Sequence, residues 1–215
     1  MVQYARQVID SAPAAALSRE RILACAVRVA DRDGLDGASL RKVAGELGVH
    51  VTSLYNHVPT KDALLDGVVD ELFASADLPL GEVSWEQWVR EFVDGVAAMA
   101  RRHPGAFAVL LRRPVQGPGA AATFEAGLAA FHRAGLDERG AYGAVKSVAL
   151  GVLGCCVEQA YLVTDTGLRT DVASLSSDTF PMLHAVTATA DDIDVVAALR
   201  EVLVDGLAQQ VAAVG

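Results

Sequence analysis

The chain has 215 residues, of which 52% are hydrophobic and 21% are charged, and its formal net charge is −9. This composition supplies enough apolar side chains for a large core and excludes general disorder. The acidic total also argues against a protein that coats nucleic acid through bulk charge. The charge is uneven, however: residues 1–64 hold eight Lys and Arg against seven Asp and Glu, and the remainder holds ten against twenty. A nearly neutral head on an acidic body can still contact phosphates through a few placed side chains.

Helical periodicity dominates the chain and alternating strand patterns are nearly absent, so we expect an all-α protein. Residues 1–17 form an expected flexible tail. The expected N-caps are Ser18, Ser39, Thr60, Ser84 and Asp137. They begin helices that end at Gly34, at Gly48, near Ala76, near His103 and near Val163. Further helices are expected over 51–57, 106–112, 119–135, near 179–188 and over 191–213.

The cysteines and the N-terminal residues indicate the cellular location to be expected for the protein. Cys25, Cys155 and Cys156 are odd in number and contain no C-x-x-C, which makes a disulfide framework or a zinc site improbable. A reducing, cytoplasmic location is therefore expected. Residues 1–18 lack the apolar core of a signal peptide, and the longest apolar stretch, 148–157, is about half of what a membrane-spanning helix needs. We expect no membrane partner.

The segment from Ser39 to His57 has the form of two helices joined by a glycine turn. Gly48 can take the left-handed backbone that a sharp turn requires, and the small Ala44 lets the second helix cross closely. Leu54 can anchor a second helix that is otherwise short and polar. This construction is typical of a helix-turn-helix, whose second helix enters the DNA major groove. Spacing alone leaves an ordinary helix pair equally open.

The expected DNA contacts come from this pair and from the residues that follow it. Thr52 and Ser53 lie near the N-terminus of the second helix, where hydroxyls can reach base edges or phosphates, and Val51 can touch a thymine methyl. Lys61 begins the next helix, where a free N-terminus and a cation together suit a phosphate. The complete set of expected DNA-binding residues is Ser39, Arg41, Val51, Thr52, Ser53, Tyr55, Asn56, His57 and Lys61.

Residues 18–65 resemble the N-terminal DNA-binding domain of TetR-family transcriptional repressors. The resemblance is carried by DRDGLDGASLRKVAGELGV and TSLYNHVPTKDALL, and it extends to SWEQWVREFV at 84–93, RRP at 112–114 and LGCCVEQ at 153–159. These last three are similar to the C-terminal domain of tetracycline repressors. The resemblance implies a tail over 1–17, a helix-turn-helix domain over 18–65 and a ligand-binding and dimerisation domain over 66–215.

The resemblance also implies partners. They are a double-stranded DNA operator, a small-molecule effector and a second copy of the chain, held through helices of about 138–163 and 191–213. Two-fold symmetry then predicts a palindromic operator. The family role implied is that of a repressor released by its effector.

Apolar and aromatic side chains on the middle helices are expected to line the effector site. They are Trp88, Phe92, Met99, Phe107, Phe124, Leu128, Phe131 and Cys155, together with Glu158, because an isolated carboxylate in an apolar run is costly unless it has a role. The resemblance aligns Glu158 with a glutamate near the magnesium ion of tetracycline repressors. Val109, however, stands at the position of the ligating histidine, and valine cannot bind a metal. We therefore expect no metal or other cofactor and a largely apolar effector.

Two other interpretations stay open. One is an all-α enzyme that uses Glu158 with His103, His132 or His184, although the sequence contains no H-E-x-x-H, no G-x-S-x-G and no glycine-rich phosphate loop. The other is a helical interaction module whose helix-turn-helix is vestigial. We expect a regulator and not an enzyme.

Overall fold

A computed structural model describes residues 16–163, 175–187 and 193–214, with the side chains of 158–163 and 186–187 outside the described part. Every regular element in these ranges is helical, as the periodicity predicts. The elements are α1 (Arg19–Asp33), α2 (Leu40–Leu47), α3 (Val51–Tyr55), α4 (Lys61–Ser75), α5 (Trp85–Arg102), α6 (Pro104–Phe107), the 3₁₀ helix η1 (Ala108–Leu111), α7 (Pro118–Arg133), α8 (Glu138–Val163), α9 (Pro181–Thr187) and α10 (Val195–Ala212). The expected tail over 1–17 falls almost wholly outside the described residues.

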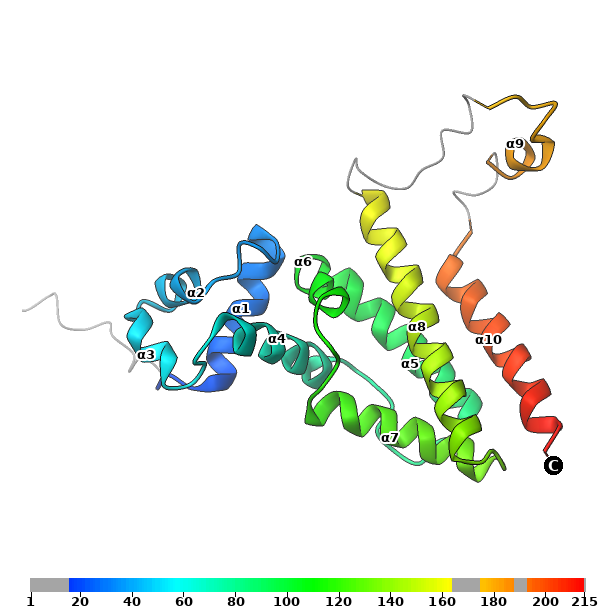
Figure 1. Cartoon of the computed structure of the whole chain (residues 1–215), viewed down its shortest axis with the longest axis horizontal. Helices are drawn as coiled ribbons and strands as arrows, with labels where there is room; N and C mark the ends of the chain where they lie inside the picture. Colours follow the sequence, from blue (N-terminus) through cyan, green and yellow to red (C-terminus); the bar gives the residue numbers. More distant parts are fainter. Residues whose placement is uncertain (1–15, 164–174, 188–192, 215) are drawn as a thin grey trace, which may run out of the picture.

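The helices form two groups along the length of the molecule (Figure 1). Helices α1 to α3 and the first part of α4 form one end, where α1 packs against α2 and α4. Helices α5, α7, α8 and α10 form the other end, and α4 reaches it through contacts with α7. The predicted domain boundary at 65–66 lies inside α4, so one continuous helix joins the two ends.

The predicted N-caps are confirmed by their hydrogen bonds. Each side-chain oxygen accepts a backbone N–H from the first turn of its helix: Ser18 from Arg21, Ser39 from Lys42, Thr60 from Ala63, Ser84 from Gln87 and Asp137 from Gly140. Such caps satisfy N–H groups that have no partner within the helix. Local side-chain chemistry thus sets where these helices begin.

Proline positions correct two of the predicted boundaries. The break predicted at His103 is confirmed, but the helix predicted over 106–112 begins at Pro104 as α6, and η1 follows it as a separate 3₁₀ turn. In the same way Pro118 begins α7, which ends at Arg133 and not at 135. Proline fits the first turn of a helix because the N–H that it lacks would have no partner there.

A continuous apolar core fills the second group of helices. Helix α5 contacts α7, α8 and α10, and buries Trp88, Val89, Phe92 and Val93. Helices α8 and α10 lie side by side and run in opposite directions (Figure 1). Helix α9 stands away from this core at the upper right of the same view.

One stretch of α8, Glu138–Val157, is long and apolar enough to cross a membrane by length and composition alone. The same stretch packs against α5, α7 and α10, and buries Val145, Val148 and Val152. A core helix of a globular protein has this composition, so the finding does not point to a membrane.

Candidate functional site: the helix-turn-helix and the helical body

The turn before α3 has the geometry that the sequence predicts. Gly48 has φ 67° and ψ 30°, in the left-handed region that a side chain disfavours. The Val49 N–H donates to the Ala44 carbonyl oxygen at 3.0 Å, which closes the end of α2. Leu54 is 0% exposed and holds α3 against the rest of the head. Thr52 and Tyr55 of α3 are exposed, whereas Val51 packs against the core beside Leu54.

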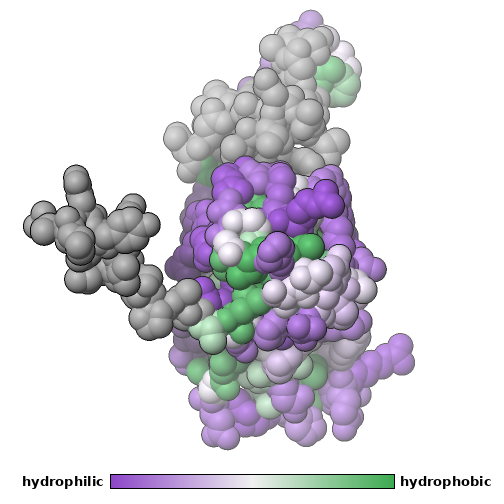
Figure 2. All heavy atoms as spheres, turned by 90° about the vertical axis from the view of Figure 1, so that its left-hand side faces the viewer, coloured by the Kyte–Doolittle hydropathy of each residue, from purple (hydrophilic) through white to green (hydrophobic). Residues whose placement is uncertain are grey.

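The predicted DNA-binding residues lie together at this end of the molecule. Arg41, Thr52, Tyr55, Asn56 and Lys61 are exposed. Val51, Ser53 and His57 are half-buried on or beside α3, and Ser39 is the half-buried cap of α2. Figure 2 looks onto this end, where most of the surface is hydrophilic and a narrow hydrophobic strip runs between the polar atoms. The placement is compatible with DNA contact, which stays a prediction for each residue.

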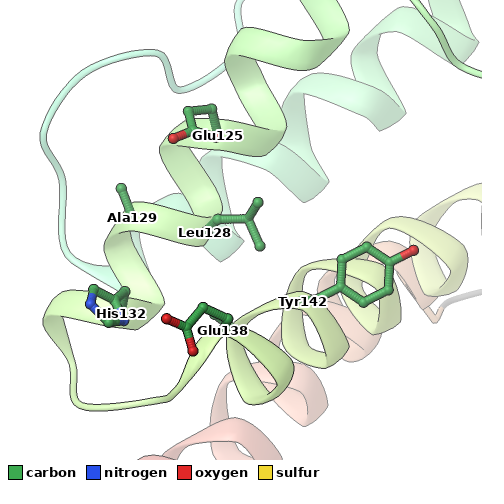
Figure 3. Close-up of a pocket in the computed structure, with 7 residues that line it drawn as sticks. Glu125, Leu128, Ala129, His132, Glu138 and Tyr142 are labelled. Atoms are coloured by element: carbon green, nitrogen blue, oxygen red, sulfur yellow. The ribbon is translucent and has the colours of Figure 1, made fainter.

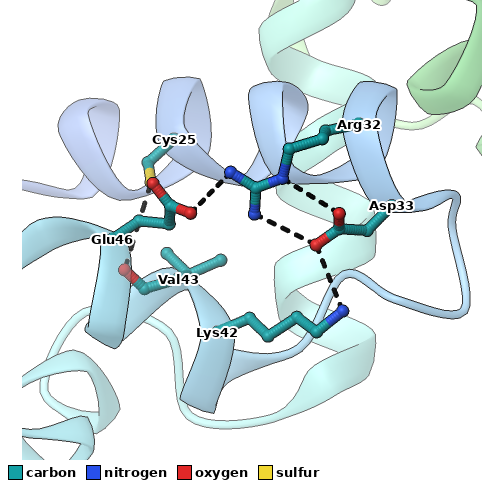
Figure 4. Close-up of polar contacts among 6 residues, drawn as sticks. All are labelled: Cys25, Arg32, Asp33, Lys42, Val43 and Glu46. Carbon is teal, nitrogen blue, oxygen red and sulfur yellow. Dashed lines mark hydrogen bonds and ion pairs between the residues drawn. The ribbon is translucent and has the colours of Figure 1, made fainter.

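An ion-pair network joins α2 to α1 (Figure 4). Arg32 binds Asp33 at 2.9 Å and Glu46 at 2.6 Å, and Lys42 binds the other oxygen of Asp33 at 3.1 Å. The hydrogen bond from Arg32, followed by that from Lys42, holds the pKa of the Asp33 carboxyl well below its usual range. Because all four side chains are solvent-exposed to some degree, the network orients α2 more than it stabilises the fold.

A second set of polar contacts joins the head to the body. The Asp31 carboxylate, at the end of α1, lies 2.8 Å from Nδ1 of His103 and accepts the backbone N–H of Ala106 at 2.9 Å. Gly105 lets α6 approach the α1 backbone this closely, because a Cβ there would meet the Ala30 carbonyl oxygen. The end of α5 and the start of α6 are therefore tied directly to α1.

Two arginines after η1 extend this connection. Arg113 binds both oxygens of Asp66 on α4, at 2.8 and 2.9 Å, and lies 3.3 Å from Asp62. The hydrogen bond to Asp66 raises the pKa of the Arg113 guanidinium further. Arg112 binds Asp36 in the loop between α1 and α2 at 2.8 Å. The segment 103–113, which we call the connecting segment, thus contacts α1, the loop between α1 and α2, and α4.

Four of the predicted effector-site residues form one aromatic cluster in the body. Trp88 stacks on Phe92 with ring centroids 4.8 Å apart, and Phe124 and Phe131 meet these two rings edge-on at 6.0 and 6.2 Å. The Trp88 indole N–H donates to the Thr123 carbonyl oxygen at 3.2 Å. Gly127 lies against the indole, since a Cβ there would be 2.5 Å from two ring carbons. In this structure the rings pack against one another.

The other predicted effector-site residues are dispersed. Phe107 is buried in α6, Cys155 is buried in α8, and Met99 borders a small hollow of about 40 Å³ between α4 and α5. The side chain of Glu158 lies outside the described residues. Leu128 lines a larger surface cleft, described next.

This cleft, of about 450 Å³, lies between α7 and α8 (Figure 3). Its lining residues are Glu125, Leu128, Ala129, His132, Glu138, Ala141 and Tyr142. Only Leu128 among these is predicted from the sequence to line the effector site, and His132 is considered there only for the enzyme interpretation. The available signal was the spacing 125, 128, 129 and 132, which places four residues on one face of α7.

Comparison with known proteins identifies both ends of the molecule. The model of the family of bacterial regulatory proteins called tetR matches residues 22–68, and the tetracyclin repressor-like C-terminal domain matches residues 78–210. The chain belongs to the tetR family. The predicted all-α fold with an N-terminal helix-turn-helix is thereby confirmed, and the family that matches is one of regulatory proteins.

Several relatives within the tetR family are similar over much of the chain. The HTH-type transcriptional repressor DrrR1 of Streptomyces coeruleorubidus is 34% identical over 69% of this chain and 56% of that protein. An HTH-type transcriptional regulator of Saccharopolyspora erythraea is 37% identical over 64% of this chain and 59% of that protein. The chain therefore matches less than two thirds of the length of either. The class D tetracycline repressor of Escherichia coli is 30% identical over 79% of this chain and 77% of the repressor.

The tetR-family protein ActR of Streptomyces coelicolor, solved in complex with (S)-DNPA, has the same fold. It superposes with a TM-score of 0.73 and 25% identity, over 94% of this chain and 100% of that one.

The three histidines considered for the enzyme interpretation are each held by a different contact in the present chain. His103 bonds Asp31, Nδ1 of His132 lies 3.0 Å from the Leu136 carbonyl oxygen, and His184 contacts the Leu175 carbonyl oxygen at 3.0 Å.

Proposed function

We propose that this tetR-family member is a repressor that binds a palindromic operator as a homodimer and is released by a small, largely apolar effector. The observation that carries the proposal is the exposed polar α3, anchored by Leu54 behind the Gly48 turn, within the part of the chain that matches the family's regulatory model. The DNA contacts proposed are those predicted from the sequence. Action on DNA places the protein in the cytoplasm.

Homodimerisation is supported by an apolar face on α8 and α10. Leu150 on α8 is 61% exposed, and Val202 on α10 is 69% exposed. Gly154 on α8 and Gly206 on α10 leave open space where a Cβ would stand, which allows a second helix pair to approach closely. By contrast, Gly151 is covered by Leu199 and Leu203 of the same chain. Such a face in water favours a partner, and the four-helix arrangement of two copies would cover it.

Dimer geometry would set the operator geometry. Two copies of α3 must reach successive major grooves, which lie roughly 34 Å apart on one side of B-DNA. Because α4 runs from the head into the body, a small rotation of α4 would change that separation. We propose that effector binding selects such a rotated state, as any ligand with different affinities for two states must do.

The connecting segment supplies a route for this coupling. Asp31 and Asp36 of the head and Asp66 of α4 each bind a residue of 103–113, which begins where α5 of the body ends. A movement of the aromatic cluster on α5 would reach α1 and α4 through these contacts. A largely apolar effector is proposed because apolar and aromatic side chains fill the body.

Selection of bound fragments from sheared genomic DNA tests the function, at about physiological salt to suppress nonspecific binding. The wild type would run beside the Arg41→Ala/Tyr55→Ala double variant and beside Arg139→Ala, an exposed arginine of α8 outside the head. We expect a palindromic site to be enriched by the wild type and by Arg139→Ala, and to be lost by the double variant. Enrichment by none of the three, or equally by all three, would contradict the proposal.

A further inference from the structure

The cleft between α7 and α8 has a chemistry that the aromatic cluster lacks. Its seven lining residues include two glutamates, a histidine and a tyrosine, but no lysine or arginine. We propose that this cleft binds an organic cation, a primary or secondary amine carried on an apolar body, and that the effector belongs to this class. The inference rests on the proposed function only where it calls the ligand an effector. It adds that the largely apolar effector carries one positive charge.

The lining residues divide the cleft into a polar end and an apolar middle (Figure 3). His132 at the end of α7 and Glu138 at the start of α8 lie near each other, beside the turn that joins the two helices. Glu125 lies two turns of α7 away, about 10 Å along the helix axis. Leu128 and Tyr142 face the space between these ends from opposite helices. A ligand in the cleft therefore meets acceptors at its ends and apolar surface along its length.

The hydrogen bond of His132 decides what its free nitrogen offers. Nδ1 lies 3.0 Å from the Leu136 carbonyl oxygen, and a carbonyl oxygen can only accept, so Nδ1 carries the proton. In the neutral ring the other nitrogen, Nε2, is then an acceptor. The Glu138 carboxylate beside it is an acceptor as well. An ammonium group supplies two or three donors and one positive charge, which matches this pair.

The remaining walls suit an apolar body attached to that ammonium. Leu128, Ala129 and Ala141 offer aliphatic surface, and the exposed Tyr142 ring offers a π face that attracts a nearby cation. A volume of about 450 Å³ lies within the range of clefts that hold small organic molecules. A ring system of two or three fused rings would fit within this volume.

Other ligand charges fit this cleft less well. An anion would approach Glu125 and Glu138 with no basic residue in the lining to offset their charge. A metal cation needs several protein ligands at short range, and no group of three His, Cys, Asp or Glu side chains that could hold a metal occurs within the described residues. A neutral apolar ligand would leave the acceptors of His132 and Glu138 unused. The lining therefore favours an organic cation.

A matched pair of probes tests the inference without DNA. We would titrate the purified full chain with 1-naphthylmethylamine and with 1-naphthalenemethanol, following naphthalene fluorescence near neutral pH. The two probes share one ring system and differ in an ammonium against a hydroxyl. We expect the amine to bind at least about tenfold more tightly, because hydrogen bonds to charged groups contribute more than neutral ones.

Three substitutions locate the site of binding. Glu138→Gln keeps the shape of the side chain and should remove most of the preference for the amine, and Glu125→Gln should weaken amine binding less. Glu82→Gln, an exposed glutamate outside the cleft, should bind both probes as the wild type does. Binding of the alcohol and the far-UV circular dichroism of Glu138→Gln serve as folding controls. Equal affinities for amine and alcohol, or an unchanged amine affinity in Glu138→Gln, would overturn the inference.

The two proposals fail separately. Amine binding that depends on Glu138, in a protein that enriches no DNA site, would leave the cleft assignment standing and remove the repressor function. Enrichment of a palindromic site by a protein that shows no preference for the amine would leave the repressor function standing and remove the cleft assignment.

Discussion

Replacing Gly105 by alanine tests whether the close approach of α6 to α1 holds the two ends of the molecule together. A Cβ at this position would overlap the Ala30 carbonyl oxygen and lie 2.7 Å from Cα of Asp31. Both are backbone atoms in the last turns of α1, so neither can rotate aside as a side chain could. The methyl group must therefore push α6 away from α1.

The size of the effect follows from two opposing terms. Inserting a methyl group into a packed interface costs roughly 1–3 kcal/mol, and alanine is favoured over glycine within a helix by about 1 kcal/mol. The displacement would also stretch the hydrogen bond from the Ala106 N–H to Asp31, now 2.9 Å. We expect a net loss of about 1–2 kcal/mol in the free energy of unfolding, or a fall in Tm of a few degrees.

Urea unfolding followed by far-UV circular dichroism measures this difference, with Gly45→Ala as the matched control. Gly45 lies inside α2 with nothing within 4 Å of a Cβ, so alanine there should stabilise by about 0.5–1 kcal/mol. The reasoning would be refuted by a Gly105→Ala protein as stable as the wild type, with an unchanged m value. Such a result would mean that α6 yields at no cost and does not hold the head.

Three further predictions concern the head and its junction with the body. Leu54→Ala removes the apolar anchor of α3 and should cost about 2–5 kcal/mol in urea unfolding, with loss of DNA retention; a cost below 0.5 kcal/mol would contradict the role of the anchor. Burial raises the pKa of the Asp70 carboxyl on α4, whose Oδ1 is buried without a hydrogen-bond partner in the described part of the chain, so Asp70→Asn should slightly increase the free energy of unfolding at pH 7. Since a raised folded pKa favours the protonated form, that gain should disappear below the unfolded pKa of about 3.9, and an equal gain at pH 3 would count against it. The lowered pKa of Asp33 has the opposite sign: its stabilisation is present above about pH 3.9 and is lost as the pH falls through the folded pKa, so Asp33→Asn should flatten the acid side of a Tm profile against pH.

Features set by a few neighbouring residues could be predicted from the sequence. The N-caps at Ser18, Ser39 and Thr60, the left-handed Gly48 and the buried Leu54 depend on local chemistry within one or two helical turns. The break predicted at His103-Pro104-Gly105 is confirmed, because α5 ends at Arg102 and His103 is not helical. The prediction is wrong only about where the next helix begins, which is Pro104 and not residue 106, since proline suits the first turn of a helix.

Features that join distant parts of the chain could not be predicted in this way. Asp31 and His103 are 72 positions apart, and Arg113 and Asp66 are 47 apart, and no periodicity connects such pairs. The aromatic residues show a related limit. Whether Trp88 lines a cavity or fills the core depends on how closely α7 crosses α5. Gly127 on α7 allows such a close crossing that the Trp88 ring packs directly against it. The α7–α8 cleft depends likewise on the angle of two helices.

The position of the two tryptophans makes the body its own optical reporter. Trp85 and Trp88 are the only tryptophans of the chain, and both lie on α5 among the buried aromatic rings. Emission from the indoles therefore records the environment of the body alone, whereas the circular dichroism signal adds up every helix. Coincident transitions of the two signals would show that the head and body unfold as one cooperative unit, and separated transitions would show that the head melts on its own.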